Sequence, residues 1–293
     1  MNFSPNVFHM CKKCGKKYDF QEGIFHKFFY GDRLGCSYCL NDFDVYKEMI
    51  HAFNYYSLGQ HYSLIGCRSN SKQIDLTPGR PYELDLTDDI GKGKLVYINY
   101  TPLGMGVLPI EIHGNSPRKP FGSNQITLYP ADFMGEAAIA KATVYYWYVP
   151  DHLINDISVM LMLDAFERYY EGSFKHSIVS AQSSLEVSLS TFLKDTIPKT
   201  SNTKIDKLYK EKNTFNHRYN KVLPKLIELL QFPEIGGSIN KKVNELRAIR
   251  NEIIHEGDSA TELDEGTLRD MLIGIFLAFK YFKLIGKSNF EHE

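Results

Sequence analysis

Two paired-cysteine motifs near the N-terminus constrain the fold of this 293-residue chain more than any other feature. Cys11 and Cys14 form one C-x2-C pair, and Cys36 and Cys39 form the other after a spacer of 21 residues. Each pair makes a tight turn that presents two thiolates to one ion, and two pairs complete the tetrahedron that Zn²⁺ prefers. The spacing therefore predicts a structural zinc site on these four cysteines.

This cysteine-rich segment resembles a zinc ribbon. Four thiolate ligands leave no position open for a substrate, so we expect no zinc-dependent catalysis. Two interpretations remain open: the metal only stabilises a fold that lacks a core, or the ribbon also recognises a partner or a nucleic acid. Reduced thiols that hold a metal are typical of the cytosol, and the sequence has no signal peptide or membrane-spanning run. We therefore expect a cytoplasmic protein without a membrane partner.

The character of the sequence changes twice and predicts three domains: residues 1–59 (zinc ribbon plus a helix over 40–58), 60–150 (β-domain) and 151–293 (helical bundle). Residues 60–150 hold eight of the twelve prolines, and these turn signals alternate with short β-rich runs. The predicted strands are 63–67, 82–86, 95–100, 107–113, 125–129 and 142–149. This pattern predicts an antiparallel β-sandwich or barrel.

From residue 151 onward, apolar residues recur at the period of an α-helix. The predicted helices are about 152–171, 174–195, 204–230, 239–256 and 265–285. Short connections between amphipathic helices predict an all-α bundle, so the whole chain is a multi-domain α+β protein. In the fourth helix, Val243, Leu246, Ile249 and Ile253 form the apolar face, and Gly257 is the expected stop.

Three polar residues converge on the end of this fourth helix. Arg250 lies about 40° from Leu246, inside the apolar face, where a guanidinium needs an acid, a partner chain or a phosphate. Asn251 and His255 are four residues apart and share another face. A histidine with a pKa near neutrality can exchange a proton with a ribose hydroxyl, and an arginine can stabilise a phosphate during the reaction.

The stretch Arg250-Asn251-x-x-x-His255 resembles the signature of the HEPN superfamily, together with the upstream segment SAQSSLEVSLSTFL. The resemblance covers about residues 152–286 and implies a HEPN helical bundle. It implies a metal-independent endoribonuclease that leaves a 2′,3′-cyclic phosphate, with Arg250, Asn251 and His255 as catalytic residues. It also implies a homodimer whose two chains build composite sites, and a role in anti-phage defence or in a toxin system. The two N-terminal domains would then sense a protein or phage-derived trigger, or restrain the nuclease.

The net charge of −1 provides no global basic field, so any RNA contact must come from a local patch. Residues 194–225 hold nine lysines and arginines against three acidic residues, a formal charge of +6. Lys207, Lys210 and Arg218 are therefore the candidate RNA-binding residues, with Tyr209, Phe215 and Tyr219 as interleaved aromatics. The alternative is a solvated helix face.

A non-enzymatic interpretation uses the same residues. Arg250 could form an ion pair with Glu186 in the predicted second helix, and His255 could simply stabilise a helix C-terminus. The protein would then be an adaptor that binds nucleic acid or a protein partner and dimerises through the bundle. A further alternative is another activity, such as nucleotide handling.

Overall fold

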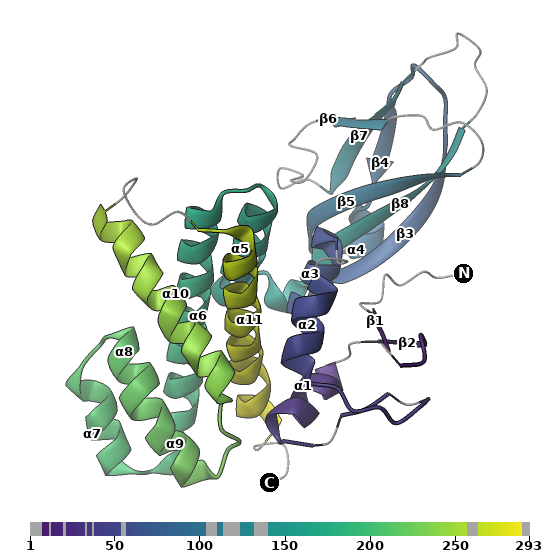
Figure 1. Ribbon diagram of the computed structural model, residues 1–293. Coiled ribbons are helices and arrows are strands. Elements are labelled where there is room, and N and C mark those ends of the chain that lie inside the picture. The colour runs from purple at the N-terminus through teal and green to yellow at the C-terminus, as the bar shows by residue number, and fades with distance from the viewer. Residues whose placement is uncertain are drawn as a thin grey trace. The chain divides into compact units, whose positions relative to one another are not determined.

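The structure is a computed structural model that divides into two compact units (Figure 1). One unit covers Ser57–Asp156, and the other joins Phe8–Tyr56 to Ile157–Glu293. The described residues are 8–11, 13–19, 22–32, 34–36, 38–53, 57–103, 110–113, 124–131, 140–256 and 263–288. The cysteine-rich segment is thus part of the same unit as the C-terminal helices, although the two are far apart in sequence.

The first unit contains two small antiparallel sheets, with strand orders β3-β8-β5 and β4-β7-β6. Its strands are β3 (Arg68–Leu76), β4 (Tyr82–Asp85), β5 (Lys94–Leu103), β6 (Ile110–His113), β7 (Gln125–Pro130) and β8 (Ala140–Val149). Its helices are α3 (Leu58–Ile65), α4 (Thr87–Ile90) and the 3₁₀ turn η1 (Asp151–Leu153). Buried residues of both sheets belong to one core, in which Leu76, Leu128 and Val144 are almost fully buried. Because both sheets are small, the chain is a mixed α/β protein, and the predicted β-sandwich or barrel is not clearly formed.

The predicted strand over residues 63–67 is wrong, because most of this run lies in helix α3. Ser57 and Gln60 form a capping box that starts the helix, and this local signal outweighs the β-rich composition. The helix packs on the sheet, where the Trp147 indole donates a hydrogen bond to Ser63. Gly59 is needed there, because a Cβ at this position would lie 2.5 Å from the Trp147 ring.

Strand β3 was missed by the sequence pattern, because most of its side chains are polar and exposed. It pairs with β8 along its whole length, from Arg68 opposite Tyr148 to Leu76 opposite Ala140. The other predicted strands are found in the structure, except that residues 107–109 lie outside the described residues.

The second unit begins with the strands β1 (Phe8–Met10) and β2 (Lys17–Asp19) and the helices α1 (Glu22–Phe29) and α2 (Val45–Phe53). Its remaining helices are α5 (Ile157–Tyr170), α6 (Phe174–Thr200), α7 (Thr203–Glu211), α8 (Phe215–His217), the π-helix η2 (Arg218–Val222), α9 (Leu223–Leu230), α10 (Gly237–Glu256) and α11 (Glu265–Ser288). The predicted bundle is therefore present. No helix within the described ranges is long and apolar enough to cross a membrane.

The predicted single helix over residues 204–230 is wrong, because this region is divided into α7, α8, η2 and α9. Lys212 is extended and ends α7, and the Thr214 side chain accepts a hydrogen bond from the His217 backbone to begin the next helix. A threonine cap of this kind offers the chain an alternative to a continuous helix.

Aromatic contacts join the N-terminal helices to the bundle. The Phe25 ring packs edge-on against Phe276 at 5.7 Å, and the Phe29 ring packs edge-on against Tyr281 at 5.2 Å. Phe53 of α2 packs against Phe166 of α5 at 5.9 Å. These rings are buried, so α1 and α2 complete the hydrophobic core of the helical unit.

Candidate functional site

The four paired cysteines lie together and fit a tetrahedral metal site. Their Sγ atoms all lie within 4.8 Å of one another, and the pairs Cys11–Cys39 and Cys14–Cys36 are each separated by 3.6 Å. A zinc ion about 2.3 Å from each of four thiolates would place the sulfurs about 3.8 Å apart. The cluster could therefore hold a metal ion such as zinc, and all four residues are those that the sequence predicted.

The two cysteine pairs are built in the same way. The Cys11 backbone N–H donates to Lys16 O at 2.9 Å, and the Cys36 N–H donates to Asn41 O at the same distance. Gly15 and Leu40, which follow the second cysteine of each pair, both adopt positive φ. The Cys14 backbone N–H donates toward the Cys11 sulfur and lowers the pKa of that thiol to about 7. Both turns thus aim two sulfurs at one point.

The end of helix α10 places the predicted catalytic residues at the surface of the helical unit. Arg250 and Asn251 are half-buried, whereas His255 is exposed on the last turn. Leu246 is fully buried and packs this helix onto the bundle, against α6 and α11. The expected helix stop at Gly257 lies outside the described residues.

Arg250 has no carboxylate partner among the residues that the structure describes. One terminal nitrogen donates to the Asn251 side-chain oxygen at 3.4 Å, and its buried Nε has no hydrogen-bond acceptor in the described part. The expected alternative partner, Glu186, accepts a hydrogen bond from Gln182 at 3.2 Å instead. Within the described residues, the ion pair with Glu186 that the non-enzymatic interpretation requires is therefore not formed.

Arg250 and His255 do not face the same way on helix α10. Five residues correspond to about 140° around a helix axis, and the two side chains also differ in burial. Helical geometry therefore directs the two groups to different sides of the same helix end.

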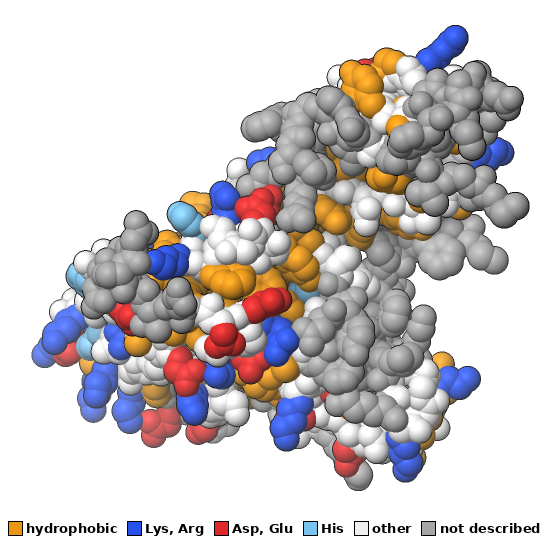
Figure 2. Space-filling view, turned by 45° about the horizontal axis from the view of Figure 1, so that its top comes forward, with side chains coloured by type: hydrophobic (Ala, Val, Ile, Leu, Met, Phe, Trp, Pro, Cys, Tyr) orange, Lys and Arg blue, Asp and Glu red, His pale blue; other side chains and the backbone are white. Residues whose placement is uncertain are grey.

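The predicted RNA-binding residues have different environments. Lys207 and Lys210 are exposed on α7, where Lys210 forms an ion pair with Asp206 at 2.6 Å. Arg218 donates to the Ser190 hydroxyl at 3.0 Å, and its guanidinium lies 4.7 Å from the Tyr209 ring centre. Arg218 thus links α6 to α7. On the face drawn in Figure 2, acidic side chains lie among the basic ones of the helical unit.

The aromatic residues of the basic segment pack largely against the protein. Tyr219 is only 3% exposed and stacks on Phe215 with ring centres 5.3 Å apart. Burial raises the pKa of the Tyr219 hydroxyl, which donates to the Asn240 side chain at 2.6 Å. These contacts give Tyr219 a structural role. Its ring is therefore not available for the stacking on RNA bases that the sequence had suggested.

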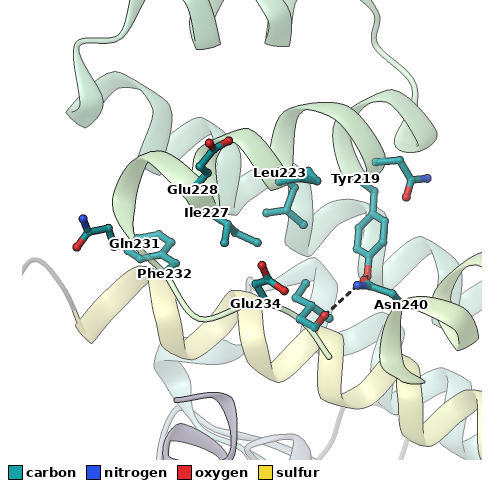
Figure 3. Close-up of a pocket in the computed structure, with 11 residues that line it drawn as sticks. Tyr219, Leu223, Ile227, Glu228, Gln231, Phe232, Glu234 and Asn240 are labelled. Carbon is teal, nitrogen blue, oxygen red and sulfur yellow. Dashed lines mark hydrogen bonds between the residues drawn. The ribbon is translucent and has the colours of Figure 1, made fainter. Parts of the chain in front are cut away.

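A cleft that no sequence motif indicated lies between η2, α9 and the start of α10 (Figure 3). Its volume is about 500 Å³. Leu223 and Ile227 line it from α9, and Glu234 lines it from the loop that follows α9. The strongly amphipathic sequence of α9 is a possible signal, but such a pattern also describes an ordinary surface helix.

Comparison with known families assigns the C-terminal region. Residues 157–283 match the family model described as RiboL-PSP-HEPN. The resemblance found in the sequence is therefore confirmed: this region matches a HEPN family model, and it contains Arg250, Asn251 and His255. No curated protein and no solved structure has a significant match to the chain. A HEPN domain supports a nucleotide-related or ribonuclease-type function in general.

Proposed function

We propose that this protein is a metal-independent endoribonuclease whose catalytic residues are Arg250, Asn251 and His255. The observation that carries the proposal is an arginine that has no carboxylate partner among the described residues, five residues before an exposed histidine, at a helix end within the HEPN match. A structural arginine in such a half-buried position would be expected to pair with an acid, and Glu186 does not supply that pair.

In the proposed reaction, the ribose 2′-oxygen attacks the adjacent phosphorus and the bond from phosphorus to the 5′-oxygen breaks. A histidine accepts the 2′-OH proton, and an acid returns a proton to the leaving 5′-oxygen. The products are a 2′,3′-cyclic phosphate and a 5′-hydroxyl. Arg250 binds the non-bridging oxygens and stabilises their developing charge, and the Asn251 amide orients Arg250 or the phosphate.

A homodimer would supply the missing geometry, because each chain could contribute its Arg250 or its His255 to a shared phosphate. Light scattering on the full chain should give the mass of two chains. The full chain is required, since the helical region alone would expose the surface that Phe25 and Phe29 cover on α11. A monomer that cleaves RNA at full rate would contradict the composite site.

Replacing Arg250 with alanine should lower RNA cleavage by about 10²–10³-fold, because the variant loses a donor that stabilises the transition state. The melting temperature should change by only a few degrees, since the substitution breaks no ion pair with a described residue. Cleavage rates and thermal unfolding should be measured in parallel.

Glu186→Ala is the matched control for this experiment. It should leave cleavage within a few-fold of wild type, because the Glu186 carboxylate interacts with Gln182 and not with Arg250. If both variants lost stability equally and cleavage followed that loss, Arg250 would be structural.

Reversing the charges of Lys207 and Lys210 to glutamate should weaken binding of single-stranded RNA. The slope of the logarithm of the binding constant against the logarithm of the salt concentration should also become about 1.4 less negative. Each lost phosphate contact contributes about 0.7 to this slope. The double variant Lys47→Glu, Lys241→Glu makes the same charge change on other exposed lysines. If the two double variants had equal effects, α7 would be an ordinary solvated helix without a specific role in RNA binding.

Arg218 is tested separately, because its substitution also breaks contacts with Ser190 and Tyr209.

The remaining parts of the proposal concern the cellular role. The zinc ion would be structural, and the β-unit, as a small sandwich of two sheets, would sense a trigger or restrain the nuclease. The protein would act in the cytoplasm, in anti-phage defence or as a toxin. Growth arrest on overexpression that depends on both Arg250 and His255 would support this role. Growth arrest that persists in both variants would favour a non-catalytic adaptor.

A further inference from the structure

The cleft beside α9 has fixed walls. The Tyr281 hydroxyl donates to Pro233 O at 2.7 Å, and this bond anchors the loop that follows α9 onto α11. The Asn240 amide donates to Ile235 O at 2.9 Å and fixes the same loop to α10. Phe232 is buried and packs toward Phe192. The cleft is therefore formed before anything binds, which reduces the ordering cost of binding.

The chemistry of the cleft is apolar on one side and acidic on the other. Leu223 and Ile227 lie on the α9 side, and the Glu234 carboxylate lies opposite them (Figure 3). Glu234 is exposed and has no hydrogen bond or ion pair among the described residues. The second acidic residue of the lining, Glu228, points away from the interior and pairs with Lys225 at 2.9 Å. The lining includes no lysine or arginine.

A π-helix forms one wall of the cleft. Tyr219 and Asn220 belong to η2, and the Tyr219 hydroxyl donates a hydrogen bond to the Asn240 side chain. Single π-turns are rare within helices and occur frequently at functional sites. The wider turn here precedes α9 directly, so it helps to set the position of Leu223 and Ile227 relative to the loop.

We propose that this cleft binds a basic, amphipathic segment of a protein partner. The segment places an arginine or lysine beside Glu234 and packs a neighbouring apolar side chain on Ile227, because Leu223 is itself almost fully buried. Charge decides between a protein and an RNA occupant: the Glu234 carboxylate, with no basic residue in the lining to offset it, repels a phosphate backbone and attracts a cation. This inference is independent of RNA cleavage, because Leu223, Ile227 and Glu234 are not among the proposed catalytic residues.

A displayed library of random short peptides, selected on the full-length His255→Ala protein, tests the proposal. The recovered peptides should combine an arginine or lysine with a large apolar residue. A synthetic peptide of the enriched sequence should bind about 2- to 5-fold more weakly to Glu234→Gln protein, which loses an ion pair at an exposed site. Replacing the peptide's arginine with its neutral isostere citrulline should weaken binding to the wild-type cleft equally, and should have no further effect on Glu234→Gln protein.

Glu228→Gln is the matched control and should change the affinity by less than two-fold, because Glu228 points away from the interior of the cleft. Ile227→Ala should weaken binding several-fold without changing the melting temperature greatly, since Ile227 is only half-buried. If no peptide is enriched, or if the enriched peptides are acidic or bind Glu234→Gln protein as tightly as wild type, the proposal is wrong. Binding of single-stranded RNA that depends on Glu234 would also overturn it.

Discussion

Replacing Cys36 with serine should remove the metal and lower the free energy of unfolding of the helical unit by several kcal/mol. Structural zinc contributes about 10–16 kcal/mol of apparent binding free energy in small zinc-dependent folds, and this energy is coupled to folding. Helix α1 lies in the spacer between the two cysteine pairs, and its Phe25 and Phe29 rings pack on α11. Loss of the metal should therefore affect the bundle as well as the cysteine-rich segment.

The measurement combines elemental analysis with thermal unfolding of the full chain. Wild-type protein purified without added metal should contain about one zinc per chain. Cys36→Ser protein should contain none and should melt at least about 10 °C lower, since each kcal/mol corresponds to about 2–4 °C in a unit of this size.

Cys67→Ser provides a matched control for the cysteine substitution. Cys67 is also buried, but it lies in the β-unit and outside the four-cysteine cluster. Its replacement should leave the zinc content unchanged and should affect stability only modestly. A Cys36→Ser protein that kept its metal and its melting temperature would refute a structural metal site.

His255→Ala should lower RNA cleavage by about 10²–10⁴-fold, because the variant loses the group that transfers protons. The melting temperature should stay within about a degree of wild type, since His255 is exposed on the last turn of α10. RNA affinity should also be nearly unchanged. Single-turnover cleavage, RNA binding and thermal unfolding measure these three quantities.

His176→Ala is the matched control for that substitution. His176 is exposed at the start of α6 in the same unit, and its Nδ1 forms a hydrogen bond with the Ser173 hydroxyl at 2.9 Å. Its replacement should leave cleavage unchanged. An equal loss in both histidine variants would mean that the assay reports general damage and not proton transfer at His255.

The sequence was sufficient for features that depend on short-range patterns. The spacing of Cys11, Cys14, Cys36 and Cys39 predicted the four-cysteine cluster, because two short turns bring the thiols together. The helical period located α5, α6, α10 and α11, whose apolar faces are long and regular. The stretch from Arg250 to His255 indicated the HEPN family that the C-terminal match confirms.

Features that depend on tertiary contacts were not predictable from the pattern. Helix α1 was missed because it lies between the cysteine pairs and is stabilised by α11, which is distant in the sequence. Strand β3 is polar and is held by pairing with β8. Tyr219 looked available for base stacking, but its ring is buried and its hydroxyl bonds to Asn240. The cleft around Glu234 arises from α9, a loop and α10 together, so no single segment predicts it.

The most direct test of the proposed ribonuclease is the chemistry of its RNA products without added metal. Labelled single-stranded RNA should be incubated with the full chain in magnesium-free buffer, with EDTA present only during the assay and the zinc content checked afterwards. We predict fragments that end in a 2′,3′-cyclic phosphate, formed by wild-type protein and lost in both Arg250→Ala and His255→Ala. Cleavage that requires Mg²⁺, or that His255→Ala protein carries out at the wild-type rate, would contradict the proposed mechanism.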